Sequence, residues 1–183
     1  MESFIEYLEE AKAFKKYFHV SFEGNLDKKE IHPKLSDYST KHLAQFKKNP
    51  KLSIKSLTDK QTIEFSMCPT IEGCINTIPN FAFLLSKNRT LQFHAYTNTT
   101  KIDDFISSAT LTKSKLSYDA FRTREIWVTE DTLELKHIGT FNISIENIDF
   151  NKMKGYIPFN QDTFKRDIKI YFAFKKLPNF RLR

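Results

Sequence analysis

Residues 91–97 read LQFHAYT and alternate between two kinds of side chain. A period of two residues is typical of a strand that places successive side chains on opposite faces of a sheet. One face of this strand would carry Leu91, Phe93 and Ala95, and the other Gln92, His94 and Tyr96. The stretch therefore predicts a half-buried strand in the middle of the chain.

The same period of two recurs on both sides of this strand. Further alternating or short apolar stretches occur at 18–22, 52–55, 63–67, 81–85, 126–128, 132–136, 141–145 and 167–174. Residues 52–55 and 63–67 are separated by a polar segment and predict a β-hairpin. Residues 68–80 hold two prolines and a glycine and predict a loop.

Helical periodicity is confined to a few segments. Residues 2–17 predict an amphipathic helix, and Ser36-Asp37 would cap a second helix over about 37–48. A short third helix would begin after Thr99 or Thr100 and end near Ala109. The sequence thus predicts one α+β domain over residues 1–183. Its mostly antiparallel sheet has about six to eight strands, with two N-terminal helices and one short central helix.

Length and composition exclude several classes of protein. The chain has 183 residues, of which 40% are hydrophobic, enough to bury a core without disulfides. It contains no run of 18 apolar residues, and its first ten residues hold four glutamates in place of a cationic leader. We therefore expect a cytoplasmic protein with no membrane partner.

The net charge of +7 is concentrated at the C-terminal end. Residues 165–183 hold seven cations against Asp167 and carry +6, whereas the preceding 164 residues sum to +1. Part of the lysine content matches the coding bias of an AT-rich genome. The basic strand and tail predict contacts with nucleic acid or an acidic protein surface, although lysines on an edge strand also prevent aggregation. The candidate contact residues are Lys165, Arg166, Lys169, Tyr171, Lys175, Lys176, Arg181 and Arg183.

Motifs for cofactors and metals are absent from the sequence. The four glycines form no G-x-G-x-x-G or G-x-x-x-x-G-K-[ST] loop. Cys68 and Cys74 have no second pair with which to complete a zinc site. We accordingly expect no cofactor and no metal.

One segment has a constellation suited to catalysis. Within residues 91–134, a strand with a histidine and a tyrosine precedes the predicted short helix, and a later strand carries a tryptophan. This order locally resembles the opening of some ADP-ribosyltransferase-type folds. The resemblance implies a histidine that holds the NAD ribose, an aromatic ring that stacks on nicotinamide, and a carboxylate that stabilises an oxocarbenium-like centre. The candidates are His94, Tyr96, Trp127 and Glu130, and the alternative is that they are packing residues.

A second histidine pattern is incomplete. His19-Val20-Ser21 resembles one half of the two-histidine phosphoesterase pattern, in which paired His-x-Thr/Ser motifs flank a phosphate. The second copy is missing, because Thr97 and Thr140 follow His94 and His137 one residue too late. A single motif cannot supply both the general base and the general acid.

Three functions are therefore compatible with the sequence. The first is a non-enzymatic binding protein that uses its basic C-terminal strand and tail. The second is an ADP-ribosyltransferase-like enzyme with an NAD pocket in residues 91–134. The third is a phage- or virus-type inhibitor or adaptor of a host protein. The absence of catalytic motifs favours the first.

Overall fold

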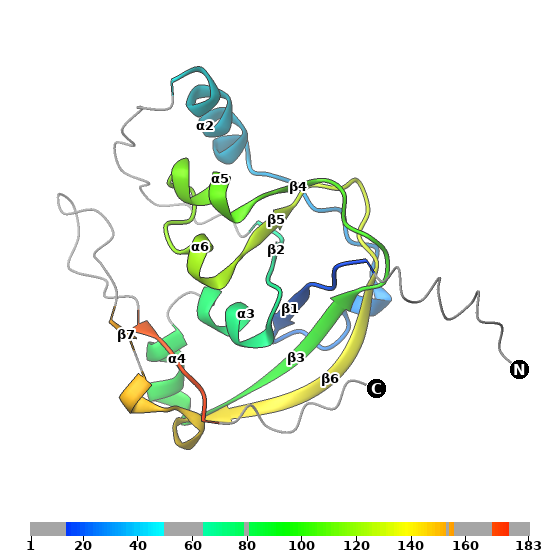
Figure 1. Ribbon diagram of the computed structural model, residues 1–183. Helices are drawn as coiled ribbons and strands as arrows, with labels where there is room; N and C mark the ends of the chain where they lie inside the picture. Colours follow the sequence, from blue (N-terminus) through cyan, green and yellow to red (C-terminus); the bar gives the residue numbers. More distant parts are fainter. Residues whose placement is uncertain (1–13, 50–63, 79–80, 153, 156–169, 176–183) are drawn as a thin grey trace, which may run out of the picture.

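A computed structural model describes residues 14–49, 64–78, 81–152, 154–155 and 170–175 of the chain. These residues form an α+β structure in which every strand pairing is antiparallel (Figure 1). The strands are β1 (Phe18–Ser21), β2 (Ser66–Met67), β3 (Thr90–Asn98), β4 (Phe105–Ile106), β5 (Ile126–Val128), β6 (Leu135–Ser144), β7 (Lys154–Gly155) and β8 (Ile170–Tyr171). The helices are α2 (Asp37–Lys48), α3 (Ile71–Thr77), α4 (Phe81–Asn88), α5 (Ser108–Lys113) and α6 (Ala120–Thr123). Short 3-10 turns are η1 (Leu26–Lys28), η2 (Ile145–Asn147) and η3 (Phe150–Lys152).

The strands do not form the single sheet that the sequence predicts. Three form a sheet in the order β1-β3-β6, three more form a second sheet in the order β2-β5-β4, and β7 pairs with β8. Figure 1 shows β3 and β6 as a long curved pair of strands along the edge of the molecule, with α4 at one end of the pair and α3 between the pair and α6. The prediction of a mostly antiparallel α+β structure is confirmed, but the number of sheets was wrong.

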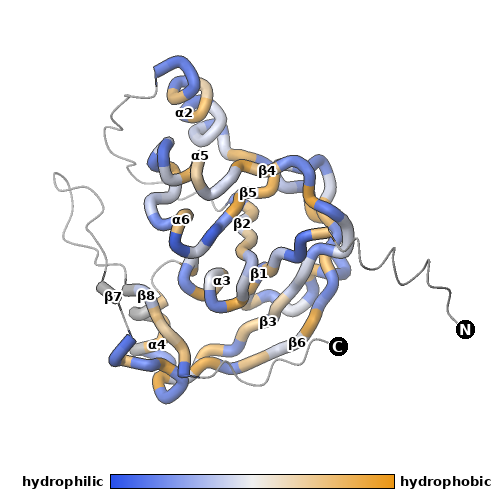
Figure 2. The backbone as a smooth tube through the Cα atoms, viewed as in Figure 1, coloured by the Kyte–Doolittle hydropathy of each residue, from blue (hydrophilic) through white to orange (hydrophobic). Residues whose placement is uncertain are grey.

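The central strand is confirmed with its predicted faces. Leu91, Phe93 and Ala95 are buried in β3, while Gln92 is exposed. Figure 2 shows hydrophobic and hydrophilic residues alternating along β3 and β6. This pattern lets one face of the β1-β3-β6 sheet pack on a hydrophobic core.

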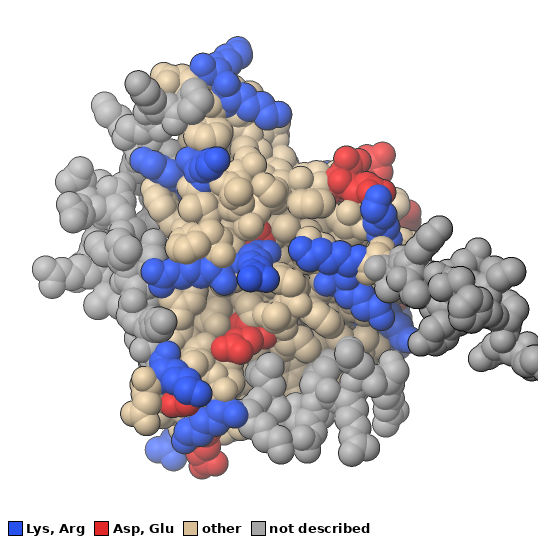
Figure 3. Space-filling view, viewed as in Figure 1, with Lys and Arg blue, Asp and Glu red and all other residues tan. Residues whose placement is uncertain are grey.

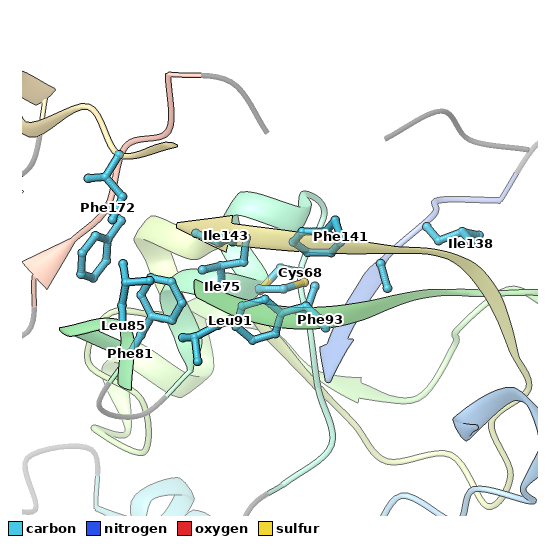
Figure 4. Close-up of a cluster of buried hydrophobic side chains, with 14 residues drawn as sticks. Cys68, Ile75, Phe81, Leu85, Leu91, Phe93, Ile138, Phe141, Ile143 and Phe172 are labelled. Carbon is cyan, nitrogen blue, oxygen red and sulfur yellow. The ribbon is translucent and has the colours of Figure 1, made fainter. Parts of the chain in front are cut away.

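That first core lies between the sheet and the helices α3 and α4. Figure 4 shows the inward side chains of both strands meeting helical residues and the C-terminal segment. Its fully or nearly fully buried members include Cys68, Ile75, Phe81, Leu85, Leu91, Phe93, Phe141, Ile143 and Phe172. The ring centroids of Phe81 and Phe172 lie 4.9 Å apart in an edge-to-face contact. The C-terminal segment is therefore part of the core.

A second core lies on the other side of the same sheet. Its buried residues are Tyr17, Met67, Tyr96, Ile102, Ile126, Val128, Leu133 and Leu135. They come from β2 and β5 of the second sheet, from β3 and β6, and from the segments next to β1, β3 and β6. The first sheet thus separates the two cores, and Tyr96 of β3 contributes to the second of them.

Helix α2 is confirmed with its predicted bounds. The Ser36 side chain accepts a hydrogen bond from the amide of Ser39, as an N-cap should. The earlier helix predicted over 2–17 lies mostly outside the described residues, and its last four residues, 14–17, are not helical. The hairpin partner at 52–55 also lies outside them.

Two segments that the sequence predicts as a loop and a strand are helices. Thr70 caps α3 by accepting from the amide of Gly73 at 3.0 Å, so Pro69 precedes a helix rather than a turn. Residues 81–85 begin α4, in which Phe81 and Leu85 are one turn apart and both 3% exposed. Two residues that are four apart lie on one face in a strand and also in a helix. The apolar pattern of residues 81–85 was therefore ambiguous between the two.

The predicted central helix and two of the predicted strands are also wrong in detail. Residues 105–106 form β4, which pairs with β5, and the following helix α5 begins only after its cap Ser107. The strands predicted at 132–136 and 141–145 are one strand, β6. Pairing with distant strands overrides the local helical periodicity here.

Among the described residues, no helix is long and apolar enough to span a bilayer.

Gly73 gives a test of how α3 is packed. A Cβ on this residue would lie 2.9 Å from the backbone oxygen of Thr123, at the end of α6. Alanine favours an isolated helix over glycine by about 1 kcal/mol. We nevertheless expect Gly73→Ala to lower the free energy of unfolding by about 1–3 kcal/mol, because the backbones of α3 and α6 would have to separate.

Urea denaturation of wild-type and variant protein measures this difference. Gln45→Ala, at an exposed position in the middle of α2, is the matched control and should change stability by less than about 0.5 kcal/mol. A stabilised Gly73→Ala variant would mean that α3 does not pack this closely on α6.

Candidate basic surface and histidine face

The segment 113–125 exposes cations and buries its acids. Lys113, Arg122 and Arg124 are exposed, whereas Asp119 and Glu125 are only 5% and 6% exposed. Figure 3 shows that blue side chains predominate over α6 and α2 on this face. The surface of this segment is therefore more positive than its sequence suggests.

Hydrogen bonds explain why Glu125 points inward. Its Oε1 accepts from the Ser66 hydroxyl at 2.7 Å and from the indole of Trp127 at 2.9 Å, and its Oε2 accepts from the Ser117 hydroxyl at 2.8 Å. A buried carboxylate needs such donors to offset the loss of water. The preceding residue, Arg124, ends α6 in the left-handed region with φ at 56°. This turn sends neighbouring residues in opposite directions, the acid inward and the guanidinium outward.

Aromatic rings flank the basic side chains. The guanidinium carbon of Arg122 lies 5.5 Å from the centre of the Phe121 ring and 5.1 Å from that of Tyr171. Both distances are within the range of a cation–π contact. Phe121 is 55% exposed, so a large part of its ring faces solvent. The contact joins α6 to the C-terminal strand β8.

The position of the C-terminal segment is fixed by one side chain of α3. Asn76 accepts from the amide of Phe172 at 2.8 Å and donates to its carbonyl oxygen at 3.1 Å. It thus makes the two hydrogen bonds that a neighbouring strand would make. The amide of Lys175 donates to Asn147 at 2.9 Å, and its side chain is exposed.

The predicted basic residues are described only in part. Tyr171 and Lys175 lie in the described segment 170–175. The remaining candidates, Lys165, Arg166, Lys169, Lys176, Arg181 and Arg183, lie outside the described residues. Sequence reasoning missed the contribution of α6, although three of its neighbouring cations, Lys113, Lys115 and Arg124, could have been read from the same stretch.

The proposed NAD-binding residues occupy two different sheets. His94 and Tyr96 lie on β3, and each of their rings lies next to that of His137 on β6, at 5.5 Å and 5.2 Å between centroids. Tyr96 is fully buried, and its hydroxyl donates to the carbonyl oxygen of Glu23 at 2.6 Å. Its side chain is therefore part of the core and holds the loop before η1.

The other two members have their own partners. Trp127 lies on β5 of the second sheet and donates to Glu125. Glu130 follows that strand, and its Oε1 accepts from the amide of Asp103 at 2.6 Å. These contacts join Trp127 and Glu130 to the second sheet and its loops, and the assignment of all four residues to one NAD pocket stays a prediction.

His19 is held on the same face of the sheet as Tyr96. The two residues are register partners, and the His19 ring stacks on Phe65 with 4.5 Å between centroids. The His19 Nδ1 donates to the backbone oxygen of Ser66 at 2.8 Å. His19 therefore packs beside the second core, against its partly buried neighbour Phe65.

Comparison with models of protein families, with curated proteins and with solved structures finds no match.

Burial of His19 predicts a dependence of stability on pH. Loss of solvation lowers the pKa of His19, and the hydrogen bond to Ser66 opposes this only in part. In the unfolded chain a histidine takes up its proton near pH 6.5, before the folded protein does so. The free energy of unfolding should then fall as the pH drops below about 6.5 toward the lower pKa of the folded state.

Urea denaturation at pH 7.5 and pH 5.0 measures this loss. In His19→Gln, which keeps an amide donor for Ser66 but cannot titrate, the loss between the two pH values should be smaller than in wild type. His32→Gln, at an exposed histidine, is the control and should keep the wild-type loss. An equal loss in wild type and His19→Gln would contradict the assignment.

Proposed function

We propose that this chain binds a nucleic-acid strand through the basic aromatic surface, which consists of Phe121, Arg122, Arg124, Tyr171 and Lys175. The observation that carries the proposal is the position of the Arg122 guanidinium between the Phe121 and Tyr171 rings. That contact joins Tyr171 of β8 to Arg122 of α6. Cations beside exposed rings are the combination that proteins use to hold phosphates and unpaired bases together.

The charge around this surface supports an anionic partner. Lys113 and Lys115 belong to the end of α5 and the turn after it, and α5 is joined to α6 by the hydrogen bond from the Phe121 amide to Thr112 at 3.2 Å. Both acids of the 113–125 segment are buried and hydrogen-bonded. A phosphate backbone on this surface would therefore contact several cations. Residues 113–125 expose no carboxylate that would repel it.

The exposed ring favours nucleic acid over an acidic protein surface. A carboxylate-rich partner needs only the cations, whereas Phe121 offers an apolar face beside a guanidinium. An unpaired base can stack on such a ring, and duplex bases cannot without leaving the helix. We therefore expect single strands to bind more tightly than duplexes of the same length.

The contribution of the arginines can be measured by a salt series. Each phosphate contact with a single strand contributes a slope of about −0.7 in a plot of log affinity against log salt. The double variant Arg122→Ala, Arg124→Ala should weaken binding of a fluorescent oligo-dT and make the slope shallower by about 1.4. Fluorescence anisotropy between 50 and 300 mM KCl gives both quantities.

The control removes the same charge elsewhere. Lys28→Ala, Lys34→Ala takes two exposed cations from the η1 loop and the segment after it. This variant should keep a slope close to that of wild type. Equal losses in the two double variants would show that net charge, rather than this surface, determines binding.

The exposed ring gives a separate prediction. Phe121→Ala removes stacking but no charge, so it should weaken oligo-dT binding about 5- to 150-fold at every salt concentration without changing the slope. Phe150→Ala removes another ring that is 57% exposed and should leave the affinity unchanged. Wild-type affinity for a poly-glutamate peptide equal to that for oligo-dT, or no effect of Phe121→Ala, would point to an acidic protein partner instead.

A further inference from the structure

Two histidines from distant parts of the sequence meet across β3 and β6. The Nδ1 atom of His94 lies 3.3 Å from the Nε2 atom of His137. The hydroxyl of Thr140 lies 3.1 Å from the same Nδ1 atom. Two imidazole nitrogens and one hydroxyl oxygen therefore gather around one point on the sheet.

A β-bulge brings these residues together. The register passes from the pair Ala95–Gly139 directly to Tyr96–His137, so Ile138 has no partner in β3. In a regular strand His137 and Thr140 would point to opposite faces, because they are three residues apart. The extra residue restores them to one face, and a bulge that redirects a side chain in this way is common next to functional sites.

The backbone of the bulge depends on glycine. Gly139 has φ at 153°, a conformation that a residue with a Cβ rarely adopts. His137 and Thr140 are three residues apart in the sequence. In the bulged strand they nevertheless lie on one face, as the His and Thr of a His-x-Thr motif do in a regular strand.

Close packing fixes the His94 ring from one side. A Cβ on Gly24 would lie 2.7 Å from Cε1 of His94, so the loop backbone lies directly against the imidazole. The same loop accepts the Tyr96 hydroxyl at Glu23, and the Tyr96 ring lies next to that of His137. The Gly24 backbone and the Tyr96 ring thus limit how far the two imidazoles can move.

The spacing of the two facing nitrogens suits a divalent transition metal ion. Two bonds of 2.0–2.1 Å at a tetrahedral angle place two ligand nitrogens about 3.3 Å apart, which is the separation of these nitrogens. Imidazole is a good ligand for zinc, nickel and copper.

We propose that His94 and His137 chelate a divalent transition metal ion, with the Thr140 hydroxyl beside it and water at the remaining positions. Two protein nitrogens make an open, exchangeable site rather than a closed structural one. Within the described residues no group of three or more His, Cys, Asp and Glu side chains is placed to hold a metal, so the further ligands of the ion would be water and the Thr140 hydroxyl. The bound ion would join β3 to β6, and it would stabilise the fold by an amount that grows with the logarithm of the free ion concentration once this exceeds the dissociation constant.

Titration calorimetry of the full chain with zinc chloride, nickel chloride and copper chloride tests the site. We expect one ion per chain, and an affinity at least tenfold lower in His94→Ala and in His137→Ala. His32→Ala removes an exposed histidine whose Nδ1 donates to Asp131, and it should bind as wild type does. Calcium, which prefers oxygen ligands, should not bind at this site.

A spectroscopic measurement keeps the test valid if a variant is less stable. Electron paramagnetic resonance of the copper-loaded protein should show hyperfine coupling to two imidazole nitrogens in wild type and to one in each single variant, His94→Gln and His137→Gln. Circular dichroism confirms that each variant is folded. Unchanged affinity and coupling in both variants, loss of binding in His32→Ala, or no heat from wild type at millimolar zinc would overturn the proposal and leave a structural histidine pair.

Discussion

The pairing of β3 with β6 is the interaction on which the rest of the structure depends. It runs from Thr90–Ser144 to Asn98–Leu135 and is the longest strand pairing described. One face of this ribbon carries Phe93 and Phe141, whose ring centroids are 5.8 Å apart, into the first core. The other face carries Tyr96 into the second core. A slip by one residue would exchange the two faces, so the bulge at Ile138 determines the placement of both cores and of the histidines.

Buried acids hold the remaining elements against this ribbon. Glu125 joins β2, β5 and the segment before α6 through three hydrogen bonds. Glu64 accepts from the Ser36 amide and, at 2.7 Å, from the Ser39 hydroxyl, and so attaches the start of α2. On the same helix, the buried His42 donates to the backbone oxygen of Ser114 at 2.7 Å. Because the acids satisfy interior donors, the lysines and arginines of these segments remain at the surface.

The sequence predicted the elements whose period is undisturbed and missed those set by distant contacts. Strands β1, β3 and β5 and the helix α2 follow directly from alternation, helical periodicity and the Ser36 cap. Helix α3 was missed because Pro69, Gly73 and Pro79 were together interpreted as loop residues, whereas Gly73 is needed where α3 touches the Thr123 backbone. The helix expected up to Ala109 was wrong because Phe105 and Ile106 pair with β5, and local sequence carries no information about that partner.

The two candidate sites could be predicted from the sequence to different degrees, again because distant contacts decide which side chains meet. The basic C-terminal segment is visible as a run of charge, but counting charge in the sequence treats Asp119 and Glu125 as neutralising their neighbours. Both acids are buried, so the exposed charged groups of this segment are cations, and α6 joins a surface that the sum of charges conceals. The histidine pair is hidden more deeply, because 43 residues separate its members and the bulge changes the spacing by one. A motif defined by residue spacing holds only where the strand is regular, so an apparent mismatch of one residue beside a glycine can indicate a bulge as readily as the absence of a site.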